Sequence, residues 1–289
     1  MNSTPEPSLD LTRLDYLHLE DAVWVVAGAT GLSTYDFDFS LFFSYKRSCF
    51  NYEEEINAIG RFGVAYDYDR VYEGLAQNNI LLIHTPEQHW RAGNLDGWYP
   101  LVKHLTARSL WFNSPPPVEE IETEFAYPVF IRGTFQTNRH SSRSSVVHSK
   151  EDYQRVVSEY CAHPRLKQQK FVVREFLFLR PVKQIAVTDM VPPSFEFRSF
   201  WWKGELVGFG PYWNTVADYA ISPQEELATI TLSRQVVQRV NVPFLVVDVA
   251  QKLDGQWVLI ECNEGQESGY AGVSPLLMWQ KIIEIERGQ

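Results

Sequence analysis

The sequence of 289 residues contains no run of about 18 apolar residues, the length that a helix needs to cross a bilayer. We therefore expect no transmembrane helix and no membrane partner. The first residues, MNSTPEPSLDLTRLD, are polar and acidic and lack the basic-then-apolar order of an export signal. These two absences predict a cytoplasmic protein.

Cysteine is scarce, and its three copies are Cys49, Cys161 and Cys262. An odd number cannot pair completely, and the spacing does not match that of a zinc site. We expect no structural disulfide, in agreement with a reducing compartment.

Positive charge is in deficit, with 26 Lys and Arg against 36 Asp and Glu and a net charge of −10. An acidic surface repels a phosphate backbone, so we expect no nucleic-acid partner, although a local basic pocket for one nucleotide is compatible with it. Hydrophobic residues make up 45% and charged residues 21% of the chain, which excludes a disordered or fibrous protein. Most of the 9 Trp, 14 Tyr and 18 Phe are expected in a core.

The first hundred residues predict a small α/β unit. Residues 1 to about 20 form a polar arm in this interpretation. Apolar runs predict buried strands at 22–27 and 80–83, and helices are expected at 51–60 and 71–77.

Two motifs in this unit are similar to cofactor or metal sites but incomplete. Residues 27–31, AGATG, lack the third glycine of a dinucleotide-binding turn, because position 34 is Thr. His84 and His89 are five residues apart, which does not fit one helix face, and no ligand cluster is near them in sequence. We interpret the first motif as a tight turn and the histidines as loop or surface residues.

Strand and turn patterns dominate the chain after a proline-rich linker at 114–117. The polar segment 133–145, with Arg139, His140 and Arg143, predicts an exposed loop that is either a solvated charge run or a phosphate-contacting segment. Ser149 is a predicted helix N-cap. Strands are expected at 127–132, 146–148, 171–179, 194–202, 205–210, 244–250 and 256–263, and helices at 150–161, 224–240 and 275–287.

The last predicted strand pair places two carboxylates opposite each other. If Asp254 and Gly255 form a two-residue turn, Asp248 faces Glu261, and Asn263 lies on the same face two residues further on. The pairs expected on the other, core-facing side are Val247 with Cys262 and Val249 with Ile260.

Opposed carboxylates repel each other and destabilise a sheet, so they need a cation or a shared proton between them. Two carboxylates and an amide supply oxygen ligands of the kind that Mg²⁺ prefers. The alternative is a solvent-exposed polar face, where water screens the charges. A one-residue slip in register would also turn one strand over.

The preceding hairpin carries Arg198 on one face with Glu196, Phe200 and Trp202. Arg198 either clamps an anion, since its fork suits phosphate oxygens, or pairs with Glu196 or with an aromatic ring. This hairpin alone leaves both interpretations open.

Five segments between about residues 127 and 272 resemble the ATP-grasp superfamily in chain order. They are the strand PVFIR, the polar loop GTFQTNRHSSRSS, the strand VVREFL, the hairpin EFRSFWWKGELVGFGPYW and the strand pair PFLVVDVAQKLDGQWVLIECNEGQESG. The strand pair is the most specific, because its Asp-x(12)-Glu-x-Asn order is similar to the metal-binding strands of the superfamily. The whole is most similar to the small bacterial ATP-grasp proteins of the arginine-for-lysine clade, and more distantly to the cell-division-cycle 123 type of chaperone.

The resemblance implies the ATP-grasp fold, an α+β and α/β architecture in which two α+β subdomains grip ATP. It places a small α/β pre-ATP-grasp-like domain at residues 1–100. The ATP-grasp domain would follow at 101–289, with subdomains at about 101–177 and 178–289. ATP and Mg²⁺ are the implied cofactors.

The resemblance also implies residue roles. Asp248, Glu261 and Asn263 would hold Mg²⁺, and Arg198 would be the catalytic residue that contacts the transferring phosphate or an acyl-phosphate oxygen. The other residues implied to bind the nucleotide are Arg132 in place of the usual strand Lys, Arg139 in the polar loop, Glu175, Phe176 and Leu177 at the adenine and ribose, and either Lys103 or Arg108 upstream. Residues 265–269 would border the acceptor substrate.

The implied reaction joins a carboxylate to an amine, or to another nucleophile, of a small molecule or peptide through an acyl phosphate. Two alternatives are an ATP-binding assembly chaperone without turnover and a β-rich binding protein that needs no nucleotide. The sequence identifies neither substrate, and it leaves open whether the protein is a homodimer.

Overall fold

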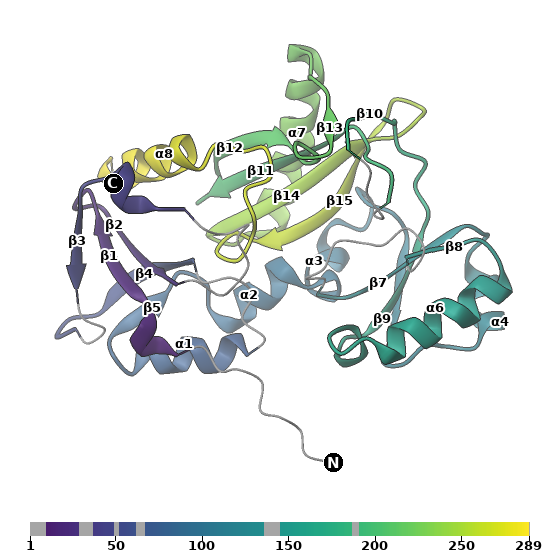
Figure 1. Cartoon of the computed structure of the whole chain (residues 1–289), viewed down its shortest axis with the longest axis horizontal. Coiled ribbons are helices and arrows are strands. Elements are labelled where there is room, and N and C mark those ends of the chain that lie inside the picture. The colour runs from purple at the N-terminus through teal and green to yellow at the C-terminus, as the bar shows by residue number, and fades with distance from the viewer. Residues whose placement is uncertain are drawn as a thin grey trace.

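The computed structural model describes residues 10–28, 37–48, 52–61, 67–135, 145–186 and 191–288. Three larger sheets follow one another along the chain, and we call them the N-terminal, middle and C-terminal sheets. In Figure 1 the N-terminal sheet lies on the left and the middle sheet on the right, with the C-terminal sheet above and between them.

The N-terminal sheet has the strand order β3-β1-β2-β4-β5, in which β2, β4 and β5 run parallel. Helix α1, Tyr68–Ala76, packs against it through Val71 and Leu75. The strands are β1 Asp15–Leu19, β2 Val23–Ala27, β3 Tyr45–Ser48, β4 Ile56–Arg61 and β5 Ile80–Leu82, and short 3-10 helices occur at η1 Leu11–Arg13 and η3 Phe39–Leu41. The expected strands at 22–27 and 80–83 and the helix at 71–77 are confirmed.

Two predictions for this portion are wrong. Residues 56–61 form strand β4 rather than the end of a helix, and residues 15–19 form strand β1 rather than part of a polar arm. Strand β4 pairs with both β2 and β5, which buries Ala58 and Ile59. This burial outweighs the helix propensity of the preceding glutamates, because propensity is a weak preference that tertiary packing overrides.

The middle sheet has the strand order β6-β9-β7-β8. Helices α4, Val118–Glu124, and α6, Lys150–Ala162, contribute side chains to one core with it. Ser149 caps α6 as predicted, because its side chain accepts a hydrogen bond from the Asp152 N–H. The strands are β6 Ser109–Phe112, β7 Val129–Gly133, β8 Val146–Val147 and β9 Phe171–Glu175, and a 3-10 helix, η4, spans Leu166–Gln168.

Strand β9 is shorter than the predicted strand at 171–179. It ends at Glu175, and the chain continues to a single bridge between Leu179 and Lys252 at the C-terminal sheet. The segment after β9 therefore connects the two sheets instead of extending one of them.

The C-terminal sheet has the strand order β12-β11-β14-β15. Helix α7, Pro223–Val240, covers one face, where Val236 and Val240 share a core with Val247. Helix α8, Pro275–Arg287, packs beside β12. The strands are β11 Glu196–Trp202, β12 Glu205–Pro211, β14 Phe244–Gln251 and β15 Trp257–Glu264, and β10 Lys183–Gln184 pairs with β13 Ala217–Asp218 in a small separate sheet.

The turn between β11 and β12 is the predicted two-residue turn. Trp202 pairs with Glu205, and both Lys203 (φ 48°) and Gly204 (φ 87°) have positive φ, as a type I′ turn requires.

Helices α2, Pro86–Gly93, and α3, Leu95–Val102, lie beneath the C-terminal sheet in Figure 1 and contact β15. The predicted domain boundary near residue 100 falls within α3. The division into domains stays a prediction.

The centre of the β14–β15 hairpin has the predicted register. Asp248 lies opposite Glu261, and Val247 lies opposite Cys262. The face with Val247 and Cys262 is buried against α7, as expected.

The turn of this hairpin differs from the prediction. Residues 253–255 form a three-residue loop in which Gly255 has φ 85°, and Val249 pairs with Leu259 rather than with Ile260. A bulge at Ile260 then restores the register. The extra loop residue and the bulge cancel each other, which is why the predicted carboxylate pair still forms.

Candidate functional site

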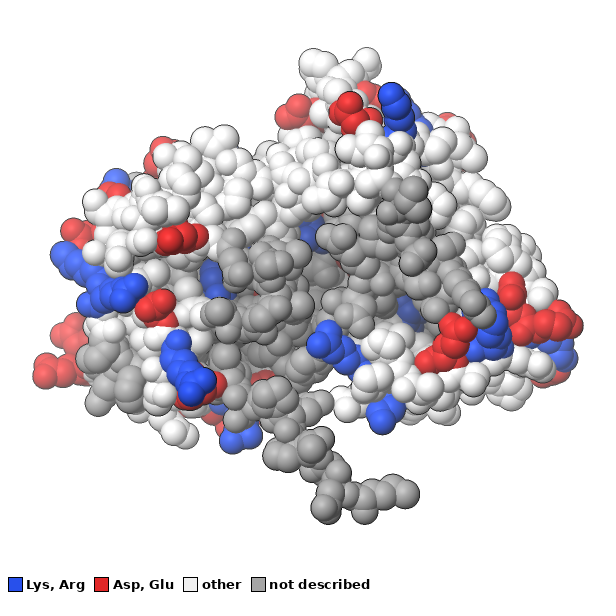
Figure 2. Space-filling view, in the orientation of Figure 1, with Lys and Arg blue, Asp and Glu red and all other residues white. Residues whose placement is uncertain are grey.

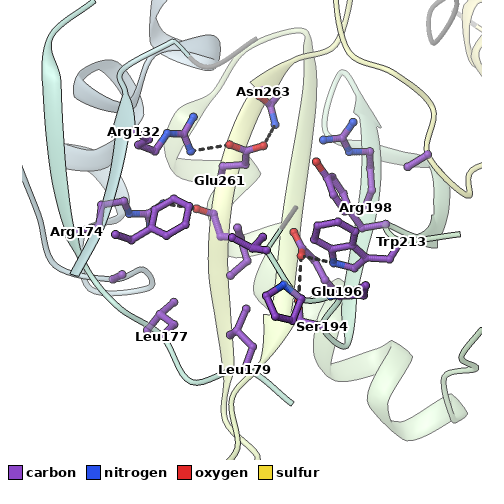
Figure 3. Close-up of a pocket in the computed structure, with 18 of the residues that line it drawn as sticks. Arg132, Arg174, Leu177, Leu179, Ser194, Glu196, Arg198, Trp213, Glu261 and Asn263 are labelled. Atoms are coloured by element: carbon purple, nitrogen blue, oxygen red, sulfur yellow. Dashed lines mark hydrogen bonds and ion pairs between the residues drawn. The ribbon is translucent and has the colours of Figure 1, made fainter. Parts of the chain in front are cut away.

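A cavity of about 750 Å³ lies where the middle and C-terminal sheets meet (Figure 3). Its walls come from β7 and β9, the connecting segment 176–181, strands β11 and β15, and the loop that follows β15. The volume is within the range of small-molecule and cofactor sites.

Asp248 and Glu261 each have an arginine partner at this cavity. The Arg198 Nε and Nη2 atoms donate to Asp248 at 2.8 and 2.6 Å, and Arg132 Nη1 donates to Glu261 at 2.7 Å. Asn263 Nδ2 lies 3.1 Å from Glu261 and 3.3 Å from Asp248, so it links the two carboxylates. The alternative of a solvent-exposed polar face is wrong, because Asp248 is 0% exposed.

Arg198 pairs with Asp248 rather than with Glu196, and its guanidinium group also lies 4.9 Å from the ring centroid of Tyr212. Its Nη1 atom donates to the carbonyl oxygen of Gly269 at 2.8 Å. The side chain thus connects β14 with the loop that follows β15.

The two opposed carboxyl groups have different proton affinities. Burial raises the pKa of Asp248 to about 6, against the opposing effect of Arg198. Burial also acts to raise the pKa of Glu261, but Arg132 and Arg198 outweigh it and lower this pKa to about 2. Glu261 is therefore an anion over the whole physiological range.

Arg174 on β9 is a cavity residue that the sequence interpretation did not single out. Its guanidinium group donates to the hydroxyl oxygens of Ser109 (3.0 Å) and Thr106 (2.8 Å) and to the carbonyl oxygen of Ile260 (3.0 Å). All three acceptors are neutral. Burial and the nearby Arg132 lower the pKa of Arg174 to about 10, so it keeps a positive charge at neutral pH. Its place in the strand VVREFL is the only signal that the sequence offered.

Glu196 is a second missed cavity residue. Its carboxylate accepts hydrogen bonds from Trp213 Nε1 at 2.9 Å and from the Ser194 hydroxyl at 3.2 Å, as Figure 3 shows. Burial, followed by the charges of Asp248 and Glu261, raises the pKa of Glu196 to about 8. The sequence pattern predicts Glu196 on the same face as Arg198, with no role other than that of an ion-pair partner.

The connecting segment after β9 supplies a mostly apolar wall. Glu175, Phe176 and Leu177 line the cavity as the predicted adenine and ribose contacts would. Ile260 on β15 also lines the cavity, because the bulge takes it out of the core-facing pairing that was predicted for it. Such a wall suits the flat face of a base, and the charged groups lie further along β15.

The remaining predicted residues lie elsewhere. Lys103 is exposed at the end of α3, and Arg108 pairs with Glu124; neither lines the cavity. Arg139, with His140 and Arg143, lies outside the described residues. The roles proposed for these side chains stay predictions.

His84 lies in the loop between β5 and α2, as predicted, but His89 lies within α2, and the expectation of surface positions is wrong for both histidines. Both are buried, with His84 Nδ1 2.8 Å from Glu264 and His89 Nε2 3.2 Å from Glu267. The Phe244 N–H donates to His84 Nε2, so the proton of a neutral His84 sits on Nδ1, facing Glu264. Both glutamates follow the predicted metal ligands in the chain, about 180 residues from the histidines, so no sequence-local signal joined them.

Ligand atoms of His89, Glu264 and Glu267 lie within 4.8 Å of one another. However, the two oxygens of Glu264 already accept hydrogen bonds from the N–H groups of Gln266 (2.9 Å) and Glu267 (3.0 Å). This cluster therefore acts as a clamp on the loop, and we do not assign it a metal ion.

The donor set of Asp248, Glu261 and Asn263 fits Mg²⁺. It consists of carboxylate and amide oxygens on adjacent strands, and Glu261 opens to the cavity with a side-chain exposure of 16%. The amide nitrogen of Asn263 faces both carboxylates here, so its oxygen becomes a ligand only after the amide rotates.

Comparison with known proteins identifies the family. A family model, the ATP-grasp domain of the arginine-for-lysine clade, family 3, matches residues 116–282, more than half of the chain. The chain belongs to this ATP-grasp family. The superfamily and clade expected from the sequence are thereby confirmed. Among curated protein sequences, none matches this chain significantly.

Solved structures of other ATP-grasp proteins have a similar fold. The VanG D-Ala:D-Ser ligase of Enterococcus faecalis is 15% identical with a TM-score of 0.57, and 80% of this chain covers 72% of it. The RimK domain protein of Sphaerobacter thermophilus is 12% identical with a TM-score of 0.54, over 80% of this chain and 78% of that one. The purK N5-carboxyaminoimidazole ribonucleotide synthetase is 11% identical with a TM-score of 0.51, over 73% and 55%. At these identities the likeness shows the shared ATP-grasp fold alone.

Within the described ranges, no helix combines the length and the apolar character that a membrane span requires. Figure 2 shows basic and acidic side chains interspersed around the rim of one face, and much of its upper part carries no charge.

Proposed function

We propose that this ATP-grasp protein is an ATP- and Mg²⁺-dependent ligase that joins a carboxylate to an amine or another nucleophile through an acyl phosphate. The observation that carries the proposal is the opposed pair of Asp248 and Glu261, with an arginine on each carboxylate and with Glu261 on the cavity wall. Nearby Arg174 adds a third guanidinium group against these two acids. These three guanidinium groups supply hydrogen-bond donors that suit the oxygens of a polyphosphate.

ATP would lie along β15 with its base at the connecting segment. The apolar wall of Phe176, Leu177 and Ile260 would hold the adenine, and Glu175 borders the same end. Glu196 would accept or donate hydrogen bonds with the ribose hydroxyls, since a carboxyl group with its raised pKa does both.

The phosphates would then meet the arginines. Arg132 and Arg174 lie on the middle sheet and Arg198 on the C-terminal sheet, so phosphate bound between them contacts both walls of the cavity. Asp248, Glu261 and Asn263 would hold Mg²⁺, which when bound neutralises charge that develops on the phosphates.

The chain's own residues position the reactants rather than form a covalent bond with them. A donor carboxylate attacks the γ-phosphorus of ATP, and the bond from that phosphorus to the ADP oxygen breaks. Arg198, tied to Asp248 and to the Gly269 carbonyl oxygen, would orient the resulting acyl phosphate. The acceptor then attacks the acyl carbon, and phosphate leaves.

The test is ADP formation from ATP and Mg²⁺ with a panel of carboxylate donors and amine acceptors. The wild type is expected to form ADP only with a matching pair, and Glu261→Gln is expected to lose at least about 100-fold of the rate, as removal of a charge-stabilising group does. Glu284→Gln, on the exposed face of α8, is the matched control and keeps the rate.

Two results would contradict the ligase proposal. One is ATP binding without ADP formation for any pair, which would favour the assembly-chaperone alternative. The other is normal turnover in Glu261→Gln, which would remove the assigned site.

A further inference from the structure

The loop that follows β15 forms one end of the cavity. Strand β15 begins near the bridge of Leu179 with Lys252 and ends at Glu264, so the loop and the apolar wall lie at opposite ends of that strand. The residues that line the cavity at this end are Glu264, the last residue of β15, and Glu267, Ser268, Gly269, Tyr270 and Ala271 in the loop.

The N-terminal sheet holds this loop in place. Arg61 Nη1, from β4, donates to the carbonyl oxygens of Gly265, Gln266 and Ser268 at 2.9 to 3.0 Å. The Gly60 N–H donates to the Gln266 side chain at 2.8 Å. In Figure 1 this yellow segment between β15 and α8 lies beside the N-terminal sheet. A loop fixed at this many points presents its side chains in a set position.

Glu267 is the charged group that this loop adds to the cavity wall besides the clamped Glu264. Its side chain is 4% exposed, and its carboxylate lies 3.2 Å from His89 Nε2. His89 stacks on Tyr68 at 3.7 Å between ring centroids, which fixes the imidazole. Burial acts to lower the pKa of His89, but the carboxylates of Glu267 and Glu264 outweigh it and raise this pKa.

The loop is also tied to the reacting end of the site. Arg198, proposed to orient the acyl phosphate, donates to the Gly269 carbonyl oxygen, two residues after Glu267. Among the described lining residues, the loop contributes acids but no Lys or Arg. A carboxylate accepts several hydrogen bonds, so Glu267 can keep His89 and still receive a donor from the cavity. This end therefore favours a cationic acceptor over an anionic one.

We propose that Glu267 binds the ammonium group of the acceptor substrate and takes its proton, which makes the acceptor a primary amine. This inference rests on the proposed ligase function. One N–H proton passes to the Glu267 carboxylate, the freed nitrogen forms the C–N bond, and the C–O bond to phosphate breaks. The second N–H proton leaves with the phosphate, and Glu267 later returns its proton to water. His89 is a positioning residue for this carboxylate.

The test separates a charged amine from a nucleophile that needs no deprotonation. The donors are amino acids and dipeptides whose amino groups are acetylated, so that they cannot act as acceptors. Glycinamide and lysinamide serve as cationic acceptors, and hydroxylamine, which is mainly unprotonated at neutral pH, serves as the neutral one. Amide and hydroxamate products are measured for the wild type, Glu267→Gln, His89→Gln and the control Glu284→Gln.

Glu267→Gln is expected to lose at least about 100-fold in amide formation, the usual scale for a proton-accepting group, while hydroxamate formation changes by less than about 3-fold. His89→Gln should show the same split with a smaller loss. Equal losses with both nucleophiles would assign Glu267 a structural role and overturn the inference, as would no loss with either. Failure of the wild type to form any hydroxamate or amide would instead overturn the ligase proposal itself.

Discussion

Glu196 on β11 is buried, and its raised pKa makes the free energy of unfolding depend on pH. Its pKa rises from the ordinary 4.5 to about 8 because of burial and the neighbouring acids. Between these two values the folded state binds more protons than the unfolded state. Linkage then requires that the free energy of unfolding falls as the pH rises through this window.

Glu196→Gln should remove this pH dependence. Glutamine imitates the neutral carboxyl group, so the variant is expected to match the wild type near pH 5 and to be the more stable near pH 8. The difference should be about 3 to 4 kcal/mol, since this window spans about three pH units and each unit corresponds to about 1.4 kcal/mol. Urea unfolding at both pH values measures it. Parallel stability curves for the two proteins would show that Glu196 is ionised in the folded state.

Arg198 and Asp248 form a buried ion pair in which each charge depends on the other. Arg198→Met leaves the fully buried Asp248 without its cation, and this should lower the free energy of unfolding by about 3 to 5 kcal/mol. The double variant Arg198→Met, Asp248→Leu should lose less than the sum of the single losses, because it removes both charges. Chemical denaturation of the single and double variants decides this, and additive losses would contradict the pairing.

At the scale of elements, the β14–β15 hairpin positions the site through two compensating irregularities. The sequence predicted the opposition of Asp248 and Glu261 because alternation and a turn signal were both readable. It did not predict the three-residue loop or the bulge, since Asp254 and Gly255 suit several turn types and a bulge depends on pairing across strands. The two errors cancelled at the carboxylate pair, whereas Ile260 was assigned to the wrong face.

Gly255 tests this loop directly. Its φ of 85° lies in the left-handed region, and a Cβ added there meets no atom within 4 Å. Gly255→Ala should therefore cost about 1 kcal/mol from backbone conformation alone, and Gly255→Asn less, because Asn adopts this region more readily. Thermal unfolding of the two variants gives the comparison. Equal stability of Gly255→Ala and the wild type would contradict the positive φ.

Strand β4 shows what the sequence could not provide at this scale. Its neighbours β2 and β5 come from residues 23–27 and 80–82, and a strand buried by such distant partners needs no alternating pattern of its own. The helix predicted at 51–60 followed local propensity. The same limit applies to Arg174 and Glu196, because the cavity that they line is formed by segments far apart in the sequence.

At the scale of the whole molecule, three sheets contribute to one site. The middle and C-terminal sheets form the cavity, and the N-terminal sheet fixes the loop that closes one end. The chain is acidic overall, with a net charge of −10, yet Arg132, Arg174 and Arg198 gather at the cavity. The sequence predicted two of these arginines through family resemblance, whereas the contacts of His84 and His89 with the loop required the folded arrangement.

The most direct test of the central claim is the binding of ATP with and without Mg²⁺. Thermal unfolding and calorimetric titration are measured for the wild type, Glu261→Gln and the control Glu284→Gln. At about 100 times its dissociation constant, a ligand stabilises the folded state by about 2.7 kcal/mol. We predict a Mg²⁺-dependent stabilisation of this size in the wild type and the control, and its loss in Glu261→Gln. No stabilisation of the wild type, or an equal one in Glu261→Gln, would contradict the assignment of this cavity as the ATP site.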